Sequence, residues 1–137
     1  FKMGPYQMSD LAGLDIGWKP GAATANPLRD MICERTARRG QKTGAGYYDY
    51  DAQRVGRPSE EVAAIVKEFA ATSGLAQRSF TQEEIIEACV FPMINEGALI
   101  LEEKMAQRAG DIDVVWLHGY GWPKDKGGPL FFGDHIG

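Results

Sequence analysis

Residues 81–108 read TQEEIIEACVFPMINEGALILEEKMAQR, and this stretch predicts the longest helix of the chain. Thr81 followed three residues later by Glu84 is the pattern of a capping box, in which the two residues bind each other's backbone at a helix start. Pro92 lies inside the helix and is expected to bend it locally. Apolar residues then recur at helical spacing up to about Arg108: Ile86, Val90, Met93, Ile94, Gly97, Leu101 and Met105.

Shorter helices are predicted on both sides of this stretch from capping residues, first-turn prolines and apolar spacing. A strand-like alternation of polar and apolar residues is missing outside a tyrosine-rich loop at 40–57, so the predicted fold class is all-α. Residues 74–81 separate two groups of helices. The shorter helices are 5–15, 27–38 with Asn26 as cap, 60–73 with Ser59 as cap, and 111–117 with Asp111 as cap.

The loop at 40–50 reads GQKTGAGYYDY and combines three glycines with three tyrosines. This composition predicts a tight irregular loop with a short extended pair, filled by aromatic rings. A dinucleotide-binding interpretation fails because Asp49 stands where the motif needs its third glycine, and no strand precedes it. A phosphate loop around Lys42 lacks its upstream glycine. Neither motif predicts a cofactor site here.

Bulk composition excludes several classes of function. The net charge is −4 with no basic stripe, so a nucleic-acid partner is not expected. No apolar run approaches the roughly 20 residues that span a membrane, and no signal peptide is recognisable. Cys33 and Cys89 lie far apart in apolar helical contexts, which predicts buried free thiols in a reducing compartment.

Candidate catalytic or metal-binding residues are few. His118 and His135 have no cysteine or carboxylate at metal-ligand spacing, and no serine lies in a nucleophile elbow, so neither a metal site nor a Ser-His-Asp triad is expected. His118 ends an apolar helix beside a glycine- and aromatic-rich loop. It can serve either as a helix C-terminal residue near the last carbonyls or as a ligand contact. The aromatic residues that follow are predicted to be core: Trp122, Phe131 and Phe132.

One short pattern occurs near both ends of the chain. Residues 4–13 read GPYQMSDLAG and residues 128–137 read GPLFFGDHIG, and both obey Gly-Pro-x4-Asp-x2-Gly. If this is a repeat, the chain is about one repeat long. The sequence is then expected to be a window onto a longer protein.

Several motifs together resemble a known family. Residues 3–18, MGPYQMSDLAGLDIGW, resemble the C-terminal domain of 3-hydroxyacyl-CoA dehydrogenases, in the form found in multifunctional fatty-acid β-oxidation enzymes. Residues 40–50 resemble that domain's G-x-K-x-G-x-G-[FWY]-Y-x-Y loop. Four later motifs resemble a second, tandem copy of that domain: NEGA at 95–98, DID at 111–113, GYGWP at 119–123 and GGP at 127–129.

The resemblance implies an all-α fold of the 6-phosphogluconate dehydrogenase C-terminal type. Residues 1–75 would be the later part of the first copy, and residues 76–137 the first part of a second, degenerate copy. The family's active-site asparagine lies five residues before a proline. Counted back from Pro92, that position is Glu87, so the second copy departs from the catalytic pattern.

The implied activity belongs to the parent enzyme, which oxidises (S)-3-hydroxyacyl-CoA to 3-oxoacyl-CoA. Its NAD-binding Rossmann domain and catalytic His–Glu pair would lie upstream, so no catalytic, cofactor-binding or metal-binding residue is expected in this chain. His118 is the one candidate substrate-binding residue. The resemblance also implies an acyl-CoA substrate for the parent, with a cytoplasmic location in bacteria or a peroxisomal one in eukaryotes, and no secretion.

Self-association is a further expectation, because apolar faces of residues 82–108 would lack partner helices and could be covered by a second copy or by domain swapping. Two alternatives remain open. The chain could be an independent, non-catalytic helical interaction or dimerisation module. It could also be the helical domain of another 3-hydroxyacid dehydrogenase, whose substrates lack CoA.

Overall fold

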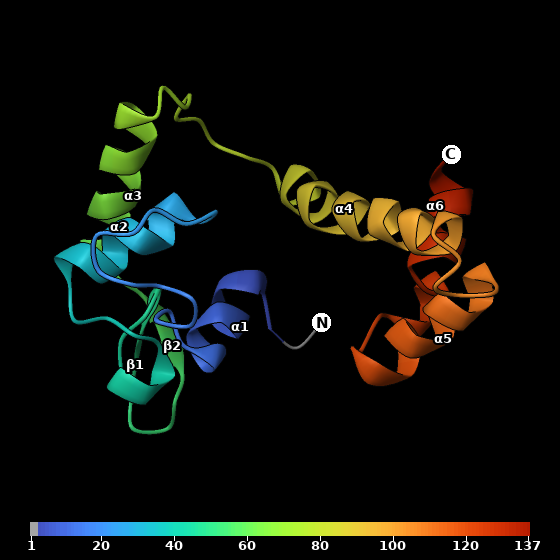
Figure 1. Cartoon of the computed structure of the whole chain (residues 1–137), viewed down its shortest axis with the longest axis horizontal. Coiled ribbons are helices and arrows are strands. Elements are labelled where there is room, and N and C mark those ends of the chain that lie inside the picture. Colours follow the sequence, from blue (N-terminus) through green and yellow to red (C-terminus); the bar gives the residue numbers. More distant parts are fainter. Residues whose placement is uncertain (1–2) are drawn as a thin grey trace. The chain divides into compact units, whose positions relative to one another are not determined.

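The computed structural model describes residues 3–137, which form two compact units, residues 3–78 and residues 79–137. Helices dominate both units (Figure 1). Within residues 3–137 the one sheet is a two-stranded antiparallel hairpin, and it lies in the tyrosine-rich region. The all-α prediction is therefore confirmed.

The first unit builds its helices from local signals that the sequence displays. Asn26 accepts the backbone N–H of Arg29 at 3.2 Å, and Ser59 accepts that of Val62 at 3.5 Å, so both predicted caps are present. The first helix is three residues shorter than predicted, because Gly13 leaves the helical conformation with φ +113°. The elements are α1 (Pro5–Ala12), α2 (Pro27–Arg35), the 3-10 turn η1 (Gln41–Thr43), β1 (Tyr48–Tyr50), β2 (Gly56–Pro58) and α3 (Glu60–Thr72).

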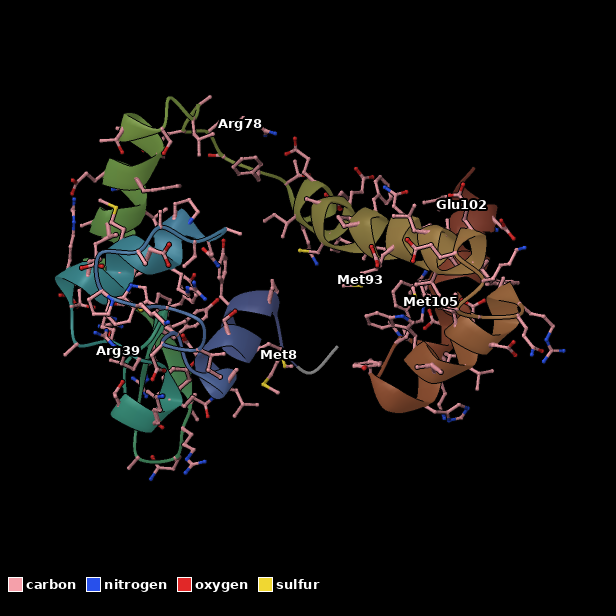
Figure 2. All side chains as sticks on the ribbon, in the orientation of Figure 1. Met8, Arg39, Arg78, Met93, Glu102 and Met105 are labelled. Carbon is pink, nitrogen blue, oxygen red and sulfur yellow. The ribbon has the colours of Figure 1, made fainter. Side chains whose placement is uncertain are left out.

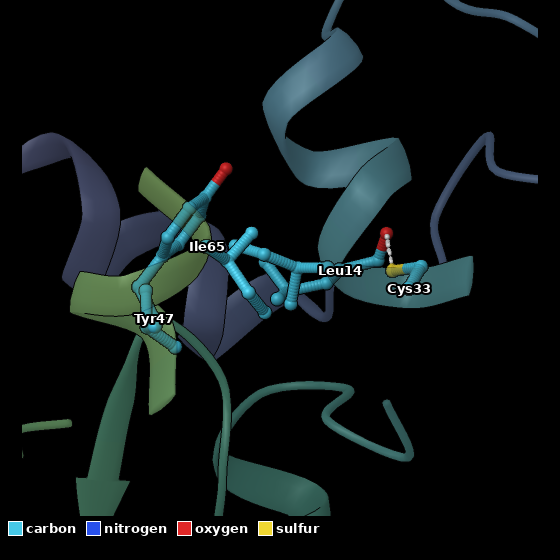
Figure 3. Close-up of a cluster of buried hydrophobic side chains, with 6 residues drawn as sticks. Leu14, Cys33, Tyr47 and Ile65 are labelled. Atoms are coloured by element: carbon cyan, nitrogen blue, oxygen red, sulfur yellow. Dashed lines mark hydrogen bonds between the residues drawn. The ribbon is translucent and has the colours of Figure 1, made fainter. Parts of the chain in front are cut away.

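The core of the first unit lies between α2, α3 and the loops beside them (Figure 3). Cys33 donates a long hydrogen bond to the carbonyl of Leu14 at 3.5 Å, and burial raises the pKa of its thiol. Cys89 is only half-buried, so the prediction of two buried thiols holds for Cys33 alone. Full burial of an aliphatic side chain contributes about 1.5–3 kcal/mol. The buried cluster comprises Leu14, Ile32, Cys33, Tyr47, Val62 and Ile65.

The second unit begins with the predicted capping box. The Thr81 hydroxyl accepts the N–H of Glu84 at 3.2 Å, and the Glu84 carboxylate accepts the N–H of Thr81 at 2.8 Å. The helix ends at Glu102, so the prediction of a helix to Arg108 is wrong. Lys104 turns to φ +59°, and Met105 is 67% exposed (Figure 2). The elements are α4 (Gln82–Glu102), α5 (Ala109–Gly119), the 3-10 turn η2 (Lys124–Lys126) and α6 (Pro129–Ile136).

The start of α5 corrects another prediction. Arg108 is the N-cap residue, and Asp111 lies in the first turn rather than at the cap. The Arg108 guanidinium pairs with Asp111 at 2.9 Å, and its hydrogen bond holds the pKa of that carboxyl below its usual value. A negative charge in the first turn still favours the helix through its interaction with the helix dipole.

Close packing seats α6 against α4 and α5. A Cβ on Gly97 of α4 would lie 2.7 Å from the Leu130 side chain, and a Cβ on Gly133 of α6 would lie 2.7 Å from that of Ile94. Two glycines therefore allow the helices to approach. Trp122 is 4% exposed, as predicted for a core residue, whereas Phe131 is 60% exposed and its predicted core role is wrong.

Candidate functional site

A buried carboxylate organises residues 40–50 of the first unit, which we call the glycine–tyrosine loop. Asp10 of α1 has no exposed surface, and its carboxylate accepts the backbone N–H groups of Tyr47 at 2.8 Å and Tyr48 at 3.1 Å. It also accepts the hydroxyl of Tyr50 at 2.8 Å. Three donors converge on one anion, which is how a buried charge becomes tolerable in a protein interior. The loop is thus an internal carboxylate cradle.

Two glycines of the loop make room for this contact. A Cβ on Gly46 would overlap the Asp10 carboxylate, and a Cβ on Gly40 would overlap the Asp10 backbone carbonyl. The amides of Gly40, Thr43 and Gly44 donate to carbonyls within the same loop. With these donors in use, the loop fits an internal carboxylate and does not fit a nucleotide phosphate.

The cradle also changes the ionisation of its tyrosines. Burial, followed by the hydrogen bond to Asp10, raises the pKa of the Tyr50 phenol. Burial likewise raises the pKa of Tyr47 to about 12. Both side chains therefore remain neutral hydrogen-bond donors well above physiological pH.

Arg38 ties the loop to α3. Its side chain is buried and donates from Nε to the carbonyl of Gly46 at 2.6 Å. The same guanidinium pairs with Asp49 of β1 and with Glu61 of α3, the second at 3.1 Å. The planar fork of arginine suits several acceptors at once, so one side chain fixes the loop between a strand and a helix.

A second buried carboxylate anchors the repeat segment of the second unit. Asp113 of α5 accepts the backbone N–H of Leu130 at 2.8 Å and that of Phe131 at 3.2 Å. These are first-turn amides of α6, which have no partner within the helix. Gly128 precedes them with φ +103°, and a Cβ there would overlap the Asp113 side chain. The acid on α5 therefore caps α6 from outside.

An apolar groove runs beside α4 and α6. Its volume is about 390 Å³, and its acidic residues Glu83 and Glu87 are exposed one helical turn apart. The resemblance predicts that Glu87 stands at the position of the family's active-site asparagine. We call this the α4–α6 groove; its lining is Glu83, Ile86, Glu87, Val90, Phe91, Phe132, Ile136 and Gly137. A groove of about 300 Å³ continues from it along Ile94, Asn95 and Gly133.

His118 lies in the last turn of α5 and is exposed. It lies outside the α4–α6 groove and its continuation. Its neighbours in sequence form an aromatic cluster, with Trp116 against Tyr120 at 4.8 Å and Trp116 against Trp122 at 6.1 Å between ring centroids. A role of His118 in substrate binding stays a prediction.

Sequence reasoning missed the three residues on which these arrangements depend: Asp10, Arg38 and Asp113. The signal for Asp10 was the aspartate shared by both repeat segments, since a glycine-rich loop can surround an acid from elsewhere in the chain. Within residues 3–137 no three His, Cys, Asp or Glu side chains gather in a way that could hold a metal ion. In the same residues no helix is both long enough and apolar enough to cross a membrane.

Comparison with known proteins gives the chain its relatives. No family model matches it. It is 40% identical over its whole length to the peroxisomal bifunctional enzyme of Homo sapiens and 38% identical to that of Danio rerio. It is 30% identical, over 98% of its length, to a peroxisomal fatty-acid β-oxidation multifunctional protein of Arabidopsis thaliana.

These relatives are much longer proteins. The chain spans 22% of the length of the human and zebrafish enzymes and 20% of the Arabidopsis protein. The resemblance to multifunctional enzymes, which the motifs indicated, is confirmed by matches that extend over the whole chain. The chain is homologous to one segment of the peroxisomal bifunctional enzymes and of a peroxisomal fatty-acid β-oxidation multifunctional protein.

Proposed function

We propose that this chain forms part of the substrate cleft and domain interface of an NAD-dependent (S)-3-hydroxyacyl-CoA dehydrogenase of fatty-acid β-oxidation. The parent oxidises the 3-hydroxyacyl-CoA to the 3-oxoacyl-CoA, and the chain itself has no catalytic centre. The observation that carries the proposal is the 40% identity over the whole chain to a peroxisomal bifunctional enzyme. Peroxisomal location of a eukaryotic parent follows from the same relatives.

The chemistry of the two units supports a structural rather than a catalytic role. The buried carboxylates of Asp10 and Asp113 are engaged by backbone amides. Glu87 replaces the family's active-site asparagine, and this exchange matters because an amide both donates and accepts hydrogen bonds whereas a carboxylate only accepts. A residue at this position can then no longer donate to a carbonyl oxygen of a substrate.

The nicotinamide cofactor would bind to the Rossmann domain of the parent. When bound there, it accepts the hydride that leaves the substrate. The residues of this chain do not fit it, because the amides of the glycine–tyrosine loop already bind Asp10 and loop carbonyls. The proposal therefore gives these residues no step in hydride transfer.

Calorimetric titration with acetoacetyl-CoA tests the substrate-cleft role. We expect saturable binding by the unmodified chain, loss of binding in His118→Ala, and retention in His135→Ala. His135 is the matched control because it also lies exposed in the last turn of a helix. No binding by the unmodified chain would contradict a substrate role for His118 and leave the chain as scaffold.

A non-catalytic interaction module is the second candidate, favoured by apolar side chains on the surface of the second unit. Large exposed apolar patches on a domain mark interaction surfaces. Sedimentation velocity across a wide concentration range tests self-association, and a constant monomer mass would count against it. The exposed residues are Ile85, Phe91, Leu99, Val114 and Val115, each 40–56% exposed.

The third candidate is the domain of a 3-hydroxyacid dehydrogenase whose substrates lack CoA. The same calorimetry distinguishes it from a β-oxidation enzyme. Titration with free acetoacetate in place of acetoacetyl-CoA is the deciding comparison. Equal binding of both compounds would favour this candidate. Binding of the thioester alone favours the β-oxidation enzyme.

A further inference from the structure

Two neighbouring rows of side chains on α4 form one wall of the α4–α6 groove and of its continuation. Residues four apart in sequence lie above one another on the same side of a helix. The rows extend along α4 for about 18 Å, since a helix rises 1.5 Å per residue. The first row is Glu83, Glu87, Phe91 and Asn95, the second is Ile86, Val90 and Ile94, and the facing wall on α6 is Phe132, Gly133 and Ile136.

Large apolar side chains remain accessible along this groove. Ile86 is 49% exposed, Phe91 is 40% exposed and Ile136 is 46% exposed. Phe132 packs edge-on against buried Trp122, with 6.2 Å between the ring centroids, so this side chain of the lining is fixed by the core. Accessible apolar surface that follows a groove is typical of an interaction site.

The charge along the groove has one sign. Glu83 and Glu87 are exposed, and no ion pair among residues 3–137 involves either carboxylate. An anionic ligand such as a CoA ester is disfavoured there by like charge, whereas a lysine or arginine finds two acceptors. Neither α4 nor α6 contains a basic residue. The lysines and arginines of residues 79–137 are Lys104, Arg108, Lys124 and Lys126.

An amphipathic helix fits these features better than a small molecule does. Two helices form the walls, and a third helix laid between them buries one apolar face, as in helix-in-groove recognition. About three turns of such a helix match the length of the rows. Its basic residues would pair with Glu83 and Glu87 near the start of α4, while its apolar side chains cover Phe91 and Ile136.

We infer that the α4–α6 groove binds a basic amphipathic helix that the rest of the parent enzyme supplies. This chain spans 22% of the human relative, so most of such an enzyme lies outside the residues described above. The inference rests on the proposed function, in which the chain forms a domain interface. It assigns that interface to one surface and gives the chemistry of the partner.

Peptides of opposite charge test the chemistry of the partner. A fluorescent leucine–lysine peptide of about 18 residues, with leucine at helical spacing, is titrated with the full chain and followed by anisotropy. We expect saturation at micromolar concentrations, and binding at least about tenfold weaker for the matching leucine–glutamate peptide. Equal binding of the two peptides, or no saturation by the lysine peptide below about 1 mM, would overturn the inference.

Substitutions at exposed positions test whether the groove is the binding site. Combining Glu83→Gln with Glu87→Gln should weaken binding of the lysine peptide about tenfold at low salt, and less at high salt, where charges are screened. Ile86→Ala should weaken it several-fold by removing apolar contact. Glu96→Gln is the matched control, since Glu96 is exposed on the same helix outside the groove. Unchanged affinity in the double variant and in Ile86→Ala would overturn the assignment.

An array of overlapping peptides tests the source of the helix. It covers the human bifunctional enzyme outside the matched segment, together with this chain. We expect binding to basic amphipathic segments of the human enzyme. Binding confined to peptides of this chain would make a second copy the occupant and overturn the assignment, as would binding to none. The outcome is independent of the acetoacetyl-CoA titration, because His118 lies outside the groove, so either proposal can fail while the other stands.

Discussion

The carboxylate of Asp113 accepts the backbone N–H of Leu130 at 2.8 Å, joining the start of α6 to α5 across 17 positions of sequence. A side-chain cap at a helix start is typically supplied by the residue just before the helix. Here Gly128 occupies that position and supplies no side chain, and the acid comes from a neighbouring helix. The cap therefore stabilises tertiary structure as well as the helix.

Asp113→Ala should lower the free energy of unfolding of the second unit by about 2–3 kcal/mol, because the buried amide of Leu130 and the partly buried amide of Phe131 lose their acceptor. Asp113→Asn should lower it less, since one carbonyl acceptor remains. Urea unfolding in a Trp18→Phe background follows this unit through Trp116 and Trp122. The control is Asp125→Ala at an exposed site, which should change stability by less than about 0.5 kcal/mol.

Asp10→Ala should destabilise the first unit by about 3–5 kcal/mol, because three donors around Asp10 lose one charged acceptor. Hydrogen exchange of the Tyr47 and Tyr48 amides is the direct measurement, and both should lose protection. Asp134→Ala, at the matching position of the repeat, is exposed and should leave exchange unchanged. Full protection of both amides in Asp10→Ala would contradict the cradle.

Gly46→Ala and Gly44→Ala separate steric overlap from backbone strain within one loop. A Cβ at 46 overlaps the Asp10 carboxylate, whereas a Cβ at 44 meets no atom within 4 Å. Gly44 has φ +71°, so its replacement should cost only about 1 kcal/mol. Gly46→Ala should cost several times more in thermal unfolding. Equal losses in the two variants would show that the overlap is relieved at little cost.

Alkaline pH should destabilise the first unit through Tyr47. Burial raises the pKa of this phenol to about 12 from an ordinary 10.0, so between these values the unfolded chain loses the proton and the folded chain keeps it. The contribution of the neutral Tyr47 phenol to the free energy of unfolding is fully present below pH 10. Between pH 10 and pH 12 the free energy of unfolding falls by about 1.4 kcal/mol per pH unit. Tyrosinate absorbance and urea unfolding measure both effects.

Tyr47→Phe supplies the comparison for this pH dependence. The variant has no phenol at position 47, so its free energy of unfolding should decline less steeply with rising pH. Tyr50 adds to the remaining slope, because burial and its bond to Asp10 raise its pKa as well. Identical slopes in both proteins would exclude Tyr47 as a source.

The sequence predicted what short-range interactions determine. The caps at Asn26, Ser59 and Thr81 act within three residues, so their patterns are visible in the chain. The end of α4 was missed because apolar spacing continues to Met105. The chain instead leaves the helix after Glu102 and turns back at Lys104, which has a positive φ, so that α5 can pack against α4.

Long-range contacts explain the rest. Asp10 accepts the amide of Tyr47 across 37 positions of sequence, and the residues around one give no sign of the contact with the other. The repeat drew attention to the shared aspartate but could not say that one copy is buried and the other exposed. That difference depends on which loop or helix pair covers each copy. Phe131 was misassigned for the same reason, since its side of α6 is not covered within the second unit.

The overlap between position 46 and the Asp10 carboxylate also restricts how this protein can evolve. A side chain gained at 46 needs the volume that the carboxylate fills, and loss of the carboxylate leaves two amides and a phenol without their acceptor. A single substitution at either position therefore passes through a less stable intermediate. Gly46 and Asp10 are therefore expected to be retained together or replaced together in related sequences.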